Sequence, residues 1–163
     1  MNKLIFILLS FFSSSAFCFN SILAIVDDEV ISTNQFNKIK DKNMQKIDKL
    51  ALLDKLIIDR IENKKILALD IRPNENVVES EIIKFAKLNG IPVDELRKTP
   101  GYNSLVLSIK YKVSKLALKQ LVIKEKISNN EMLTNKTNYQ EIYNSWINEI
   151  KQNTYIEIYE DKL

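Results

Sequence analysis

Residues 47–70 read IDKLALLDKLIIDRIENKKILALD, and this stretch decides the fold. Its apolar side chains recur every three or four residues, which is the period of an α-helix with one apolar side. The regular positions are Leu50, Leu53, Ile57 and Ile61, and the stripe is widened by Leu56, Ile58, Leu67 and Leu69. The sequence therefore predicts a long helix with one side buried against other parts of the protein.

The composition favours long helices and excludes most familiar catalysis. The 163 residues fit one domain and include only two glycines and three prolines, too few for glycine-rich phosphate loops or turn-dense β folds. There is no histidine and Cys18 is the only cysteine, so His-dependent nucleophiles, intramolecular disulfides and cysteine-based metal sites are excluded. We expect no catalytic residue, no cofactor and no metal. The net charge of +3 comes from bases that alternate with acids, which argues against nucleic-acid binding.

Short segments at both ends of the chain predict a small antiparallel sheet. Residues 22–26 and 29–31 are apolar and β-branched and flank Asp27 and Asp28, the pattern of a hairpin with a tight turn. Residues 155–159 form a short β-branched and aromatic run, typical of a terminal strand. Because an isolated two-stranded ribbon is marginally stable in water, we expect the terminal strand to pair with the hairpin.

Capping residues mark the boundaries of the first helices. Ser32 begins a helix, because Gln35 three residues later completes a reciprocal capping box. Asn74 caps a helix that runs to about Leu88, and Gly90 ends it because glycine accepts the left-handed geometry of a helix end. The inward side chains of this helix are predicted to be Val78, Ile82 and Phe85.

Two further helices follow a short helix that begins at Pro92. The first spans residues 102–127, and its breadth of apolar positions implies contacts on more than one side. These positions are Leu105, Ile109, Val113 and Leu116, broadened by Leu107, Leu118, Leu121 and Val122. Residues 139–151 form a last amphipathic helix with Ile142, Trp146 and Ile150 aligned. We expect Trp146 to pack this helix onto the earlier ones, and residues 128–138 to be a short linker.

Residues 1–18 have the layout of a signal peptide. A basic Lys3 precedes an apolar run at residues 4–12, and small residues follow. The run is too short to cross a bilayer, which takes about 20 residues, so we expect no stable membrane anchor after cleavage. Cleavage is expected after Ala16 or Cys18, which leaves residues 19–163 as a single exported domain.

Three sequences occur in order along the predicted helices: LDKLIIDR at 53–60, IRPNE at 71–75 and NGIPVDEL at 89–96. With the hairpin before them and a long helix after them, they resemble the N-terminal core of the SurA family of periplasmic chaperones. The tail WINEIKQNTYIEI at 146–158 resembles the closing helix and strand by which that family's C-terminus returns to its N-terminal core. The resemblance implies a mainly α fold, with a helical core and a small antiparallel sheet formed by the N-terminal hairpin and the C-terminal strand.

The chain departs from this family in one respect that bears on chemistry. SurA proteins usually carry one or two parvulin-type prolyl isomerase modules before the closing helix, whereas only residues 128–138 stand in that place here. Parvulin modules also place histidines in their active site, and this chain has none. The resemblance therefore implies a periplasmic holdase-type chaperone that is not an enzyme. It would bind unfolded outer-membrane proteins or other exported polypeptides and assist their assembly.

A holdase needs exposed apolar surface to shield the apolar segments of its clients. Adaptable and aromatic side chains recur at promiscuous binding surfaces. On that ground the candidates for a peptide-binding groove are Phe36, Met44, Phe85, Tyr102 and Leu107. For any one apolar side chain, ordinary core packing is the simpler interpretation.

Two other functions are compatible with the sequence. An exported structural or assembly factor dedicated to one protein partner would use the same apolar stripes without general chaperone activity. A hydrolase would use acidic pairs such as Asp27 and Asp28, or Glu79 and Glu81. Neighbouring carboxylates alone carry little information, however, and turn chemistry explains the first pair.

Overall fold

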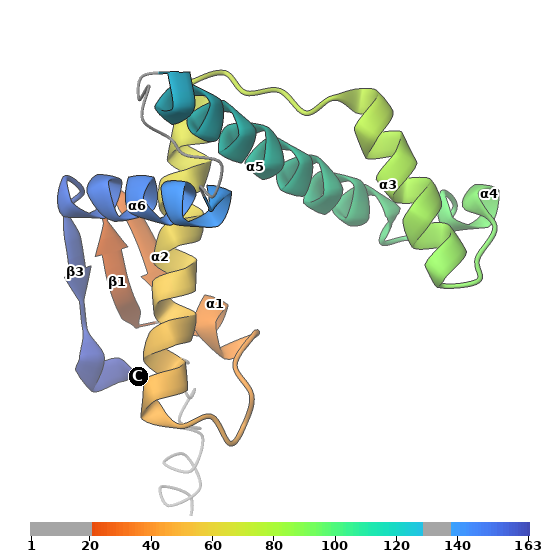
Figure 1. Cartoon of the computed structure of the whole chain (residues 1–163). Helices are drawn as coiled ribbons and strands as arrows, with labels where there is room; N and C mark the ends of the chain where they lie inside the picture. The colour runs from red at the N-terminus through yellow and green to blue at the C-terminus, as the bar shows by residue number, and fades with distance from the viewer. Residues whose placement is uncertain (1–20, 129–137) are drawn as a thin grey trace, which may run out of the picture.

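The computed structural model describes residues 21–128 and 138–163, which form a mainly helical protein with a small three-stranded sheet (Figure 1). The elements are β1 (Ile22–Val26), β2 (Glu29–Ser32), α1 (Thr33–Asn37), α2 (Lys46–Ala68), α3 (Glu75–Leu88), α4 (Val93–Leu96), α5 (Tyr102–Ser128), α6 (Tyr139–Gln152), β3 (Ile156–Ile158) and the 3-10 helix η1 (Glu160–Lys162). The predicted fold class is confirmed. The predicted signal peptide lies outside the described residues, as do residues 129–137 of the predicted linker.

The sheet brings the two ends of the described chain together. β1 lies in the middle, with β2 and β3 antiparallel on either side of it. Val26 is paired with Glu29 in the hairpin and with Ile156 in β3. The hairpin turn places Asp27 at a φ of 53°, a left-handed conformation that Asp adopts more readily than most residues. The predicted pairing of the terminal strand with the hairpin is confirmed, and the strand is limited to residues 156–158.

The predicted start of α1 and the predicted start and end of α3 are also confirmed. The Ser32 side chain accepts a hydrogen bond from the Gln35 backbone amide (3.3 Å), and the Gln35 side chain accepts one from the Ser32 amide (3.1 Å). The Asn74 side chain accepts hydrogen bonds from two amides in the first turn of α3. Gly90, at a φ of 65°, follows the end of that helix. These local contacts explain why α1 begins, and why α3 begins and ends, where the sequence predicts. Helix α1 ends at Asn37, so Ile39 and Met44, which the sequence predicts on the same helix, lie beyond it.

Three separate cores stabilise the molecule. The first core lies between the sheet, α1 and α2, and consists of Leu23, Ala24, Val26, Ile31, Phe36, Leu53, Ile57 and Ile61. The second core lies between α3, α4 and α5, and consists of Val78, Ile82, Ala86, Leu96, Ile109 and Val113. The third core joins α2, α5 and α6, and consists of Ile66, Leu118, Val122, Tyr143 and Ile147. We call α3, α4 and residues 102–113 of α5 the arm, and the other described elements the body.

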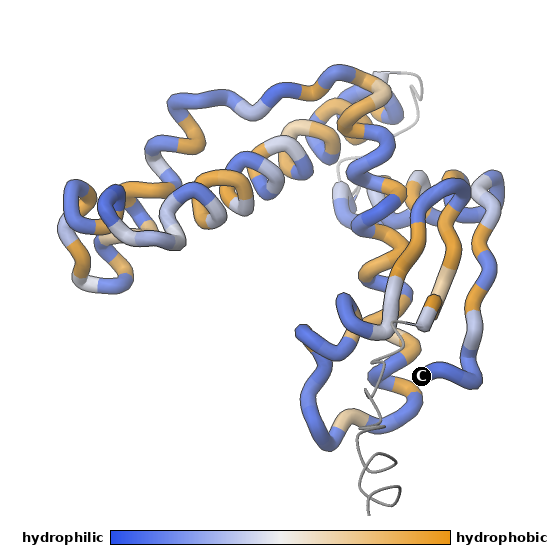
Figure 2. The backbone as a smooth tube through the Cα atoms, turned by 180° about the vertical axis from the view of Figure 1, so that it is seen from behind, coloured by the Kyte–Doolittle hydropathy of each residue, from blue (hydrophilic) through white to orange (hydrophobic). Residues whose placement is uncertain are grey.

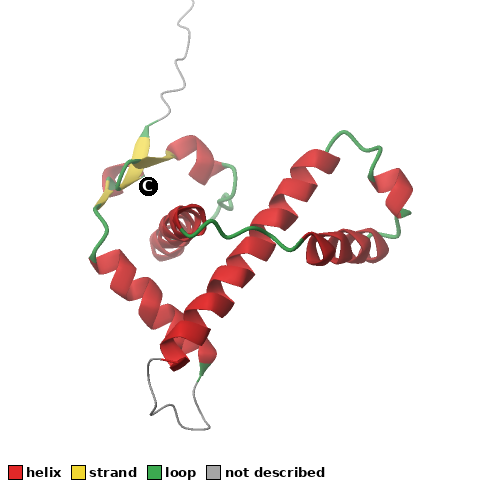
Figure 3. Cartoon of the chain, turned by 90° about the horizontal axis from the view of Figure 1, so that it is seen from above, coloured by secondary structure: helices red, strands yellow, loops and turns green. Residues whose placement is uncertain are grey.

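The arm extends from one side of the body (Figure 1). Seen from above, α5 and α6 diverge from a shared corner, with α6 running toward the sheet and α5 toward α3 and α4 (Figure 3). Hydrophobic residues lie along the strands and along α2 in the body, and they recur at intervals along the helices of the arm (Figure 2). The third core lies where the arm meets the body.

Helix α5 is buried on two different sides. Ile109 and Val113 pack into the second core with α3 and α4, whereas Leu118 and Val122 pack into the third core with α2 and α6. The prediction of contacts on more than one side is therefore confirmed. The change of side leaves Leu107 and Leu116 exposed, although the sequence predicts both within the apolar stripe.

Two predicted sets of inward side chains need correction. On α3, Phe85 is 37% exposed and Ala86 is buried in its place, because Ala86 continues the four-residue row of Val78 and Ile82 and Phe85 does not.

On α6, the fully buried residues are Tyr143 and Ile147, one position after the predicted Ile142 and Trp146. Trp146 is half-buried at the edge of the third core and stacks on Tyr143, with ring centroids 5.4 Å apart. It thus contributes to packing α6 against α2 and α5, but from the edge of the core.

Candidate functional site: a lysine-rimmed cavity between arm and body

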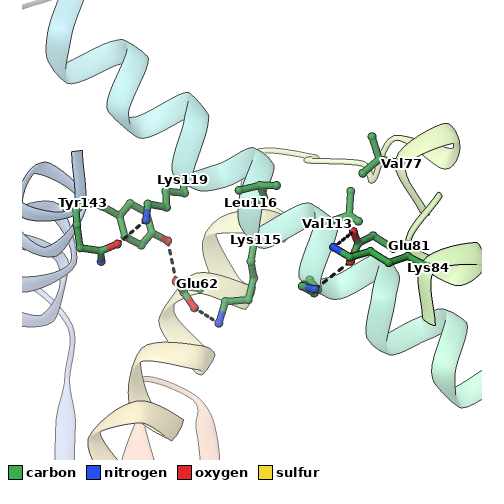
Figure 4. Close-up of a pocket in the computed structure, with 11 residues that line it drawn as sticks. Glu62, Val77, Glu81, Lys84, Val113, Lys115, Leu116, Lys119 and Tyr143 are labelled. Carbon is green, nitrogen blue, oxygen red and sulfur yellow. Dashed lines mark hydrogen bonds and ion pairs between the residues drawn. The ribbon is translucent and has the colours of Figure 1, made fainter. Parts of the chain in front are cut away.

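A cavity of about 540 Å³ lies where the arm meets the body (Figure 4). Helices α2, α3, α5 and α6 all contribute side chains to its walls. These side chains fall into three groups: an apolar group on α3 and α5, a buried polar cluster shared by α2, α5 and α6, and a rim of lysines. The described chain thus places apolar and charged groups around one opening.

The apolar group consists of Val77, Val113 and Leu116. Val113 belongs to the second core, whereas Val77 is 39% exposed and Leu116 is 52% exposed. Leu116 follows Val113 by three residues, so it lies on the side of α5 that is buried farther back at Ile109. The apolar side of the arm therefore continues into the cavity.

The buried polar cluster is centred on Glu62, whose side chain is enclosed between helices. Its Oε1 accepts a hydrogen bond from the Tyr143 hydroxyl (2.7 Å), and its Oε2 lies 2.5 Å from the Lys115 ammonium. Lys115 also donates to the Asp59 carboxylate (2.5 Å), and the Tyr111 hydroxyl donates to the Asp59 carbonyl oxygen (3.0 Å). Side chains of α5 and α6 are thereby attached to one turn of α2.

Two members of this cluster, Tyr143 and Lys115, keep their protons at neutral pH. Burial, followed by the hydrogen bond to Glu62, raises the pKa of Tyr143 far above its usual value. Burial disfavours the charged form of Lys115, but the hydrogen bonds to Asp59 and Glu62 outweigh it and raise the pKa of Lys115. Because Tyr143 keeps its proton and Lys115 keeps its charge, both side chains stay paired with Glu62 and hold α5 and α6 against α2.

The rim is formed by three lysines on α3 and α5. Lys84 and Lys112 share the Glu81 carboxylate at 3.5 Å and 3.0 Å. Lys119 donates to the Gln140 side-chain oxygen (2.5 Å), which carries no charge. The hydrogen bond from Lys112, with the charge of Lys84, holds the pKa of Glu81 below its usual value. The rim therefore has three positive charges and one negative charge at neutral pH.

The five predicted groove residues do not come together in one place. Phe36 is 2% exposed and belongs to the first core, which corrects its assignment to a surface groove. Met44 is half-buried between α1 and α2, and Tyr102 is half-buried against the second core. Phe85 and Leu107 are exposed on the arm, as a client-binding surface needs. None of the five lines the cavity.

Charged residues within the apolar rows of the sequence point to the cavity, although the apolar pattern alone does not. Glu62 interrupts the row Ile58–Glu62–Ile66, which otherwise continues an apolar side of α2. A charge in such a row needs a partner when it is buried. Lys115 and Lys119, one turn apart on α5, supply positive charge toward the same region. A search for charges within apolar rows identifies Glu62, but the sequence alone does not identify its partners.

The acidic pairs considered for hydrolysis are engaged in ion pairs. Asp27 and Asp28 both bind the Lys64 ammonium, at 2.9 Å and 3.0 Å. Glu79 binds Arg97 at 2.5 Å. Within residues 21–128 and 138–163, no three side chains of His, Cys, Asp or Glu are grouped to hold a metal ion.

In comparisons with known proteins, no family pattern and no curated protein matches the sequence. In the part of the chain that the structure describes, every helix is too short or too polar to cross a membrane.

Proposed function

We propose that the chain is a periplasmic holdase-type chaperone, exported by its N-terminal signal, that binds unfolded outer-membrane proteins and assists their assembly without covalent chemistry. The resemblance of its sequence to the SurA family implies this function. The pairing of β1 with β3 supports the proposal, because the same resemblance implies that the two ends of the chain fold together. The exposed apolar side chains of the arm support it as well.

The observation that carries the proposal is the placement of Leu116 and Val77 in one cavity. Both are large apolar side chains that stay partly exposed beside a second core that is already packed. A client side chain that entered the cavity would remove this surface from water, at about 25 cal/mol for each Å² of apolar area. The cavity volume of about 540 Å³ lies within the range usual for binding sites, roughly 300–1,000 Å³.

Further contacts are available along the arm. Phe85 and Leu88 on α3 and Leu107 on α5 are exposed apolar side chains outside the cavity. Each alone contributes little, but an extended client can use several at once. Binding the unfolded client in this way lowers the concentration of free aggregating chains by mass action.

Aggregation measurements test the proposal. An outer-membrane β-barrel protein unfolded in urea is diluted with or without the purified chain, and light scattering is followed. We expect the chain to suppress the scattering. The double variant Leu116→Asp with Val77→Asp should suppress it less, because client binding would then bury carboxylates beside apolar groups.

The matched control is Leu67→Asp with Leu69→Asp. These two leucines are exposed near the end of α2 and lie outside the cavity, so the control makes the same change in charge. Equal loss of activity in both double variants would argue against the cavity as the client site. Failure of the unaltered chain with every client would reject the chaperone function, and success with a single client would favour a dedicated assembly factor.

A further inference from the structure

The rim of the cavity is positively charged on balance. Lys84 and Lys112 share Glu81, and the partners of Lys119 are uncharged: the Gln140 side chain and the Tyr143 ring, whose centroid is 5.6 Å from the ammonium. The side chains of Lys84 and Lys112 are largely exposed, so a single shared carboxylate holds them only weakly. These lysines are available to a second anionic partner.

The negative charges at the inner end of the cavity do not cancel this excess for a ligand at the rim. Both oxygens of Glu62 are engaged, one by Tyr143 and one by Lys115, and only 5% of the residue is exposed. Asp59 binds the same Lys115 ammonium. The inner cluster therefore keeps one net negative charge against two net positive charges at the rim, so an excess of positive charge remains. Lys84 and Lys112 are exposed to solvent, and Lys119 is half-buried.

Apolar and basic groups alternate along the wall formed by α5. Leu116 follows Lys112 by four residues and precedes Lys119 by three, so the three side chains neighbour one another on the helix surface. Figure 4 shows Leu116 on α5 between Lys119 and Val113, with Glu81 and Lys84 on the facing helix α3. A ligand that contacts Leu116 therefore has ammonium groups within reach on both sides.

We propose that the cavity selects extended client segments in which a large apolar side chain is flanked by Asp or Glu. The apolar side chain contacts Leu116 and Val77, and the flanking carboxylates pair with the rim lysines Lys84, Lys112 and Lys119. This selection rests on the proposed chaperone function and narrows it to a class of client sequence. Because the pairs form at an exposed rim, the selection weakens as salt screens them.

Three capped peptides of equal length test the selection. Each has the same central Leu-Phe pair, flanked on both sides by two Glu, two Gln or two Lys residues. Isothermal titration calorimetry with the purified chain should give the tightest binding for the Glu peptide, about five- to tenfold tighter than the Gln peptide, and the weakest binding for the Lys peptide. At about 1 M salt the three affinities should converge, because the screening length falls to about 3 Å.

A pair of variants identifies the lysines. Lys112→Gln with Lys119→Gln should weaken the Glu peptide about five- to tenfold and change the Gln peptide by less than about twofold. The matched control, Lys38→Gln with Lys42→Gln, removes two exposed lysines between α1 and α2 that lie outside the cavity. It should leave the order and the spacing of the three affinities unchanged.

Several results would overturn this selection. Equal affinities for the three peptides would contradict the role of charge, and so would an equal loss of affinity for the Glu peptide in the two double lysine variants. Either result is compatible with suppression of aggregation by the chain. Binding of decanoate without binding of any peptide would assign the cavity to anionic amphiphiles. Failure to suppress aggregation at all is a different outcome, because it rejects the chaperone function on which the selection rests.

Discussion

Asp27 and Tyr155 exchange two hydrogen bonds across 128 positions of the chain. The Asp27 amide donates to the Tyr155 carbonyl oxygen (2.8 Å), and the Tyr155 amide donates to the Asp27 carboxylate (3.1 Å). The same carboxylate accepts a hydrogen bond from Lys64 of α2 (2.9 Å). One side chain in the hairpin turn therefore joins the turn, the approach to β3 and the central helix.

Replacement of Asp27 should separate these contributions. Asp27→Asn keeps an oxygen acceptor and tolerates the left-handed conformation, so we expect a small loss of stability. Asp27→Ala removes the hydrogen-bond acceptor. It also places alanine, whose side chain cannot form a local hydrogen bond, at the left-handed φ of 53°. We therefore expect the free energy of unfolding to fall by about 1–2 kcal/mol. Urea unfolding followed by circular dichroism measures both. Equal stability of the two variants would contradict the role of the hydrogen bond to Tyr155.

The stability of the sheet is expected to decrease in acid. The hydrogen bond from Lys64 is the main cause that holds the pKa of Asp27 below its ordinary value of 3.8, and it lowers the pKa of Asp28 as well. A carboxyl group with a lowered pKa in the folded state contributes stability that is present above its unfolded pKa and is lost as the pH falls through its folded pKa. The urea concentration at the midpoint of unfolding should therefore decrease once the pH drops below about 4. The fall should be shallower in Asp27→Asn, and an identical slope would count against this pair.

The Tyr143 hydroxyl should be worth more than that of an exposed tyrosine. Tyr143→Phe leaves a buried Glu62 oxygen without its donor, which costs about 1–3 kcal/mol. Tyr139→Phe, one turn earlier on the exposed side of α6, is the control and should change stability by less than about 0.5 kcal/mol. Thermal or urea unfolding of both variants gives the comparison, and similar values would show that the buried cluster does not hold α6 in place.

Truncation of two leucines on α5 should affect stability and client binding to different extents. Leu118 is fully buried in the third core, so Leu118→Ala should cost about 2–5 kcal/mol. Leu116 lines the cavity and is half exposed, so Leu116→Ala should cost less than about 1 kcal/mol of stability while weakening client binding. Unfolding and aggregation assays on the same preparations test this. A large loss of stability in Leu116→Ala would mean that this side chain belongs to the core.

The arm should unfold locally while the body stays folded. Its core has no member from the sheet, α1 or α2, so Ile82→Ala should speed amide hydrogen exchange in α3 and α4 more than in β1 and β2. Ile83→Ala, at the adjacent exposed position, should leave exchange unchanged. Exchange that rises equally in sheet and arm after Ile82→Ala would show that the three cores unfold as one.

The sequence predicts the order of the elements and their ends well, because these depend on local chemistry. The capping box of Ser32 and Gln35, the cap at Asn74 and the stop at Gly90 involve residues that are close in the chain. The pairing of β3 with the hairpin is predicted correctly from the need of a small ribbon for a third strand.

The sequence predicts less well which side of each helix is buried where partners change. Leu116 continues the apolar row of α5 but lies beyond the second core, and Phe36 follows a capping box but fills the first core. Burial at these positions depends on where another helix ends, which is a long-range property. The cavity is built from four helices, so it has no signature within any single stretch of sequence.

The central strand β1 is synthesised first among the described elements, yet one of its two neighbours is β3, which is synthesised almost last. Until β3 has left the ribosome, one edge of β1 has open backbone amides and carbonyls. The body can therefore reach its final state only after β3 has left the ribosome, whereas α3, α4 and the start of α5, which contact one another over short sequence distances, have what they need to assemble earlier.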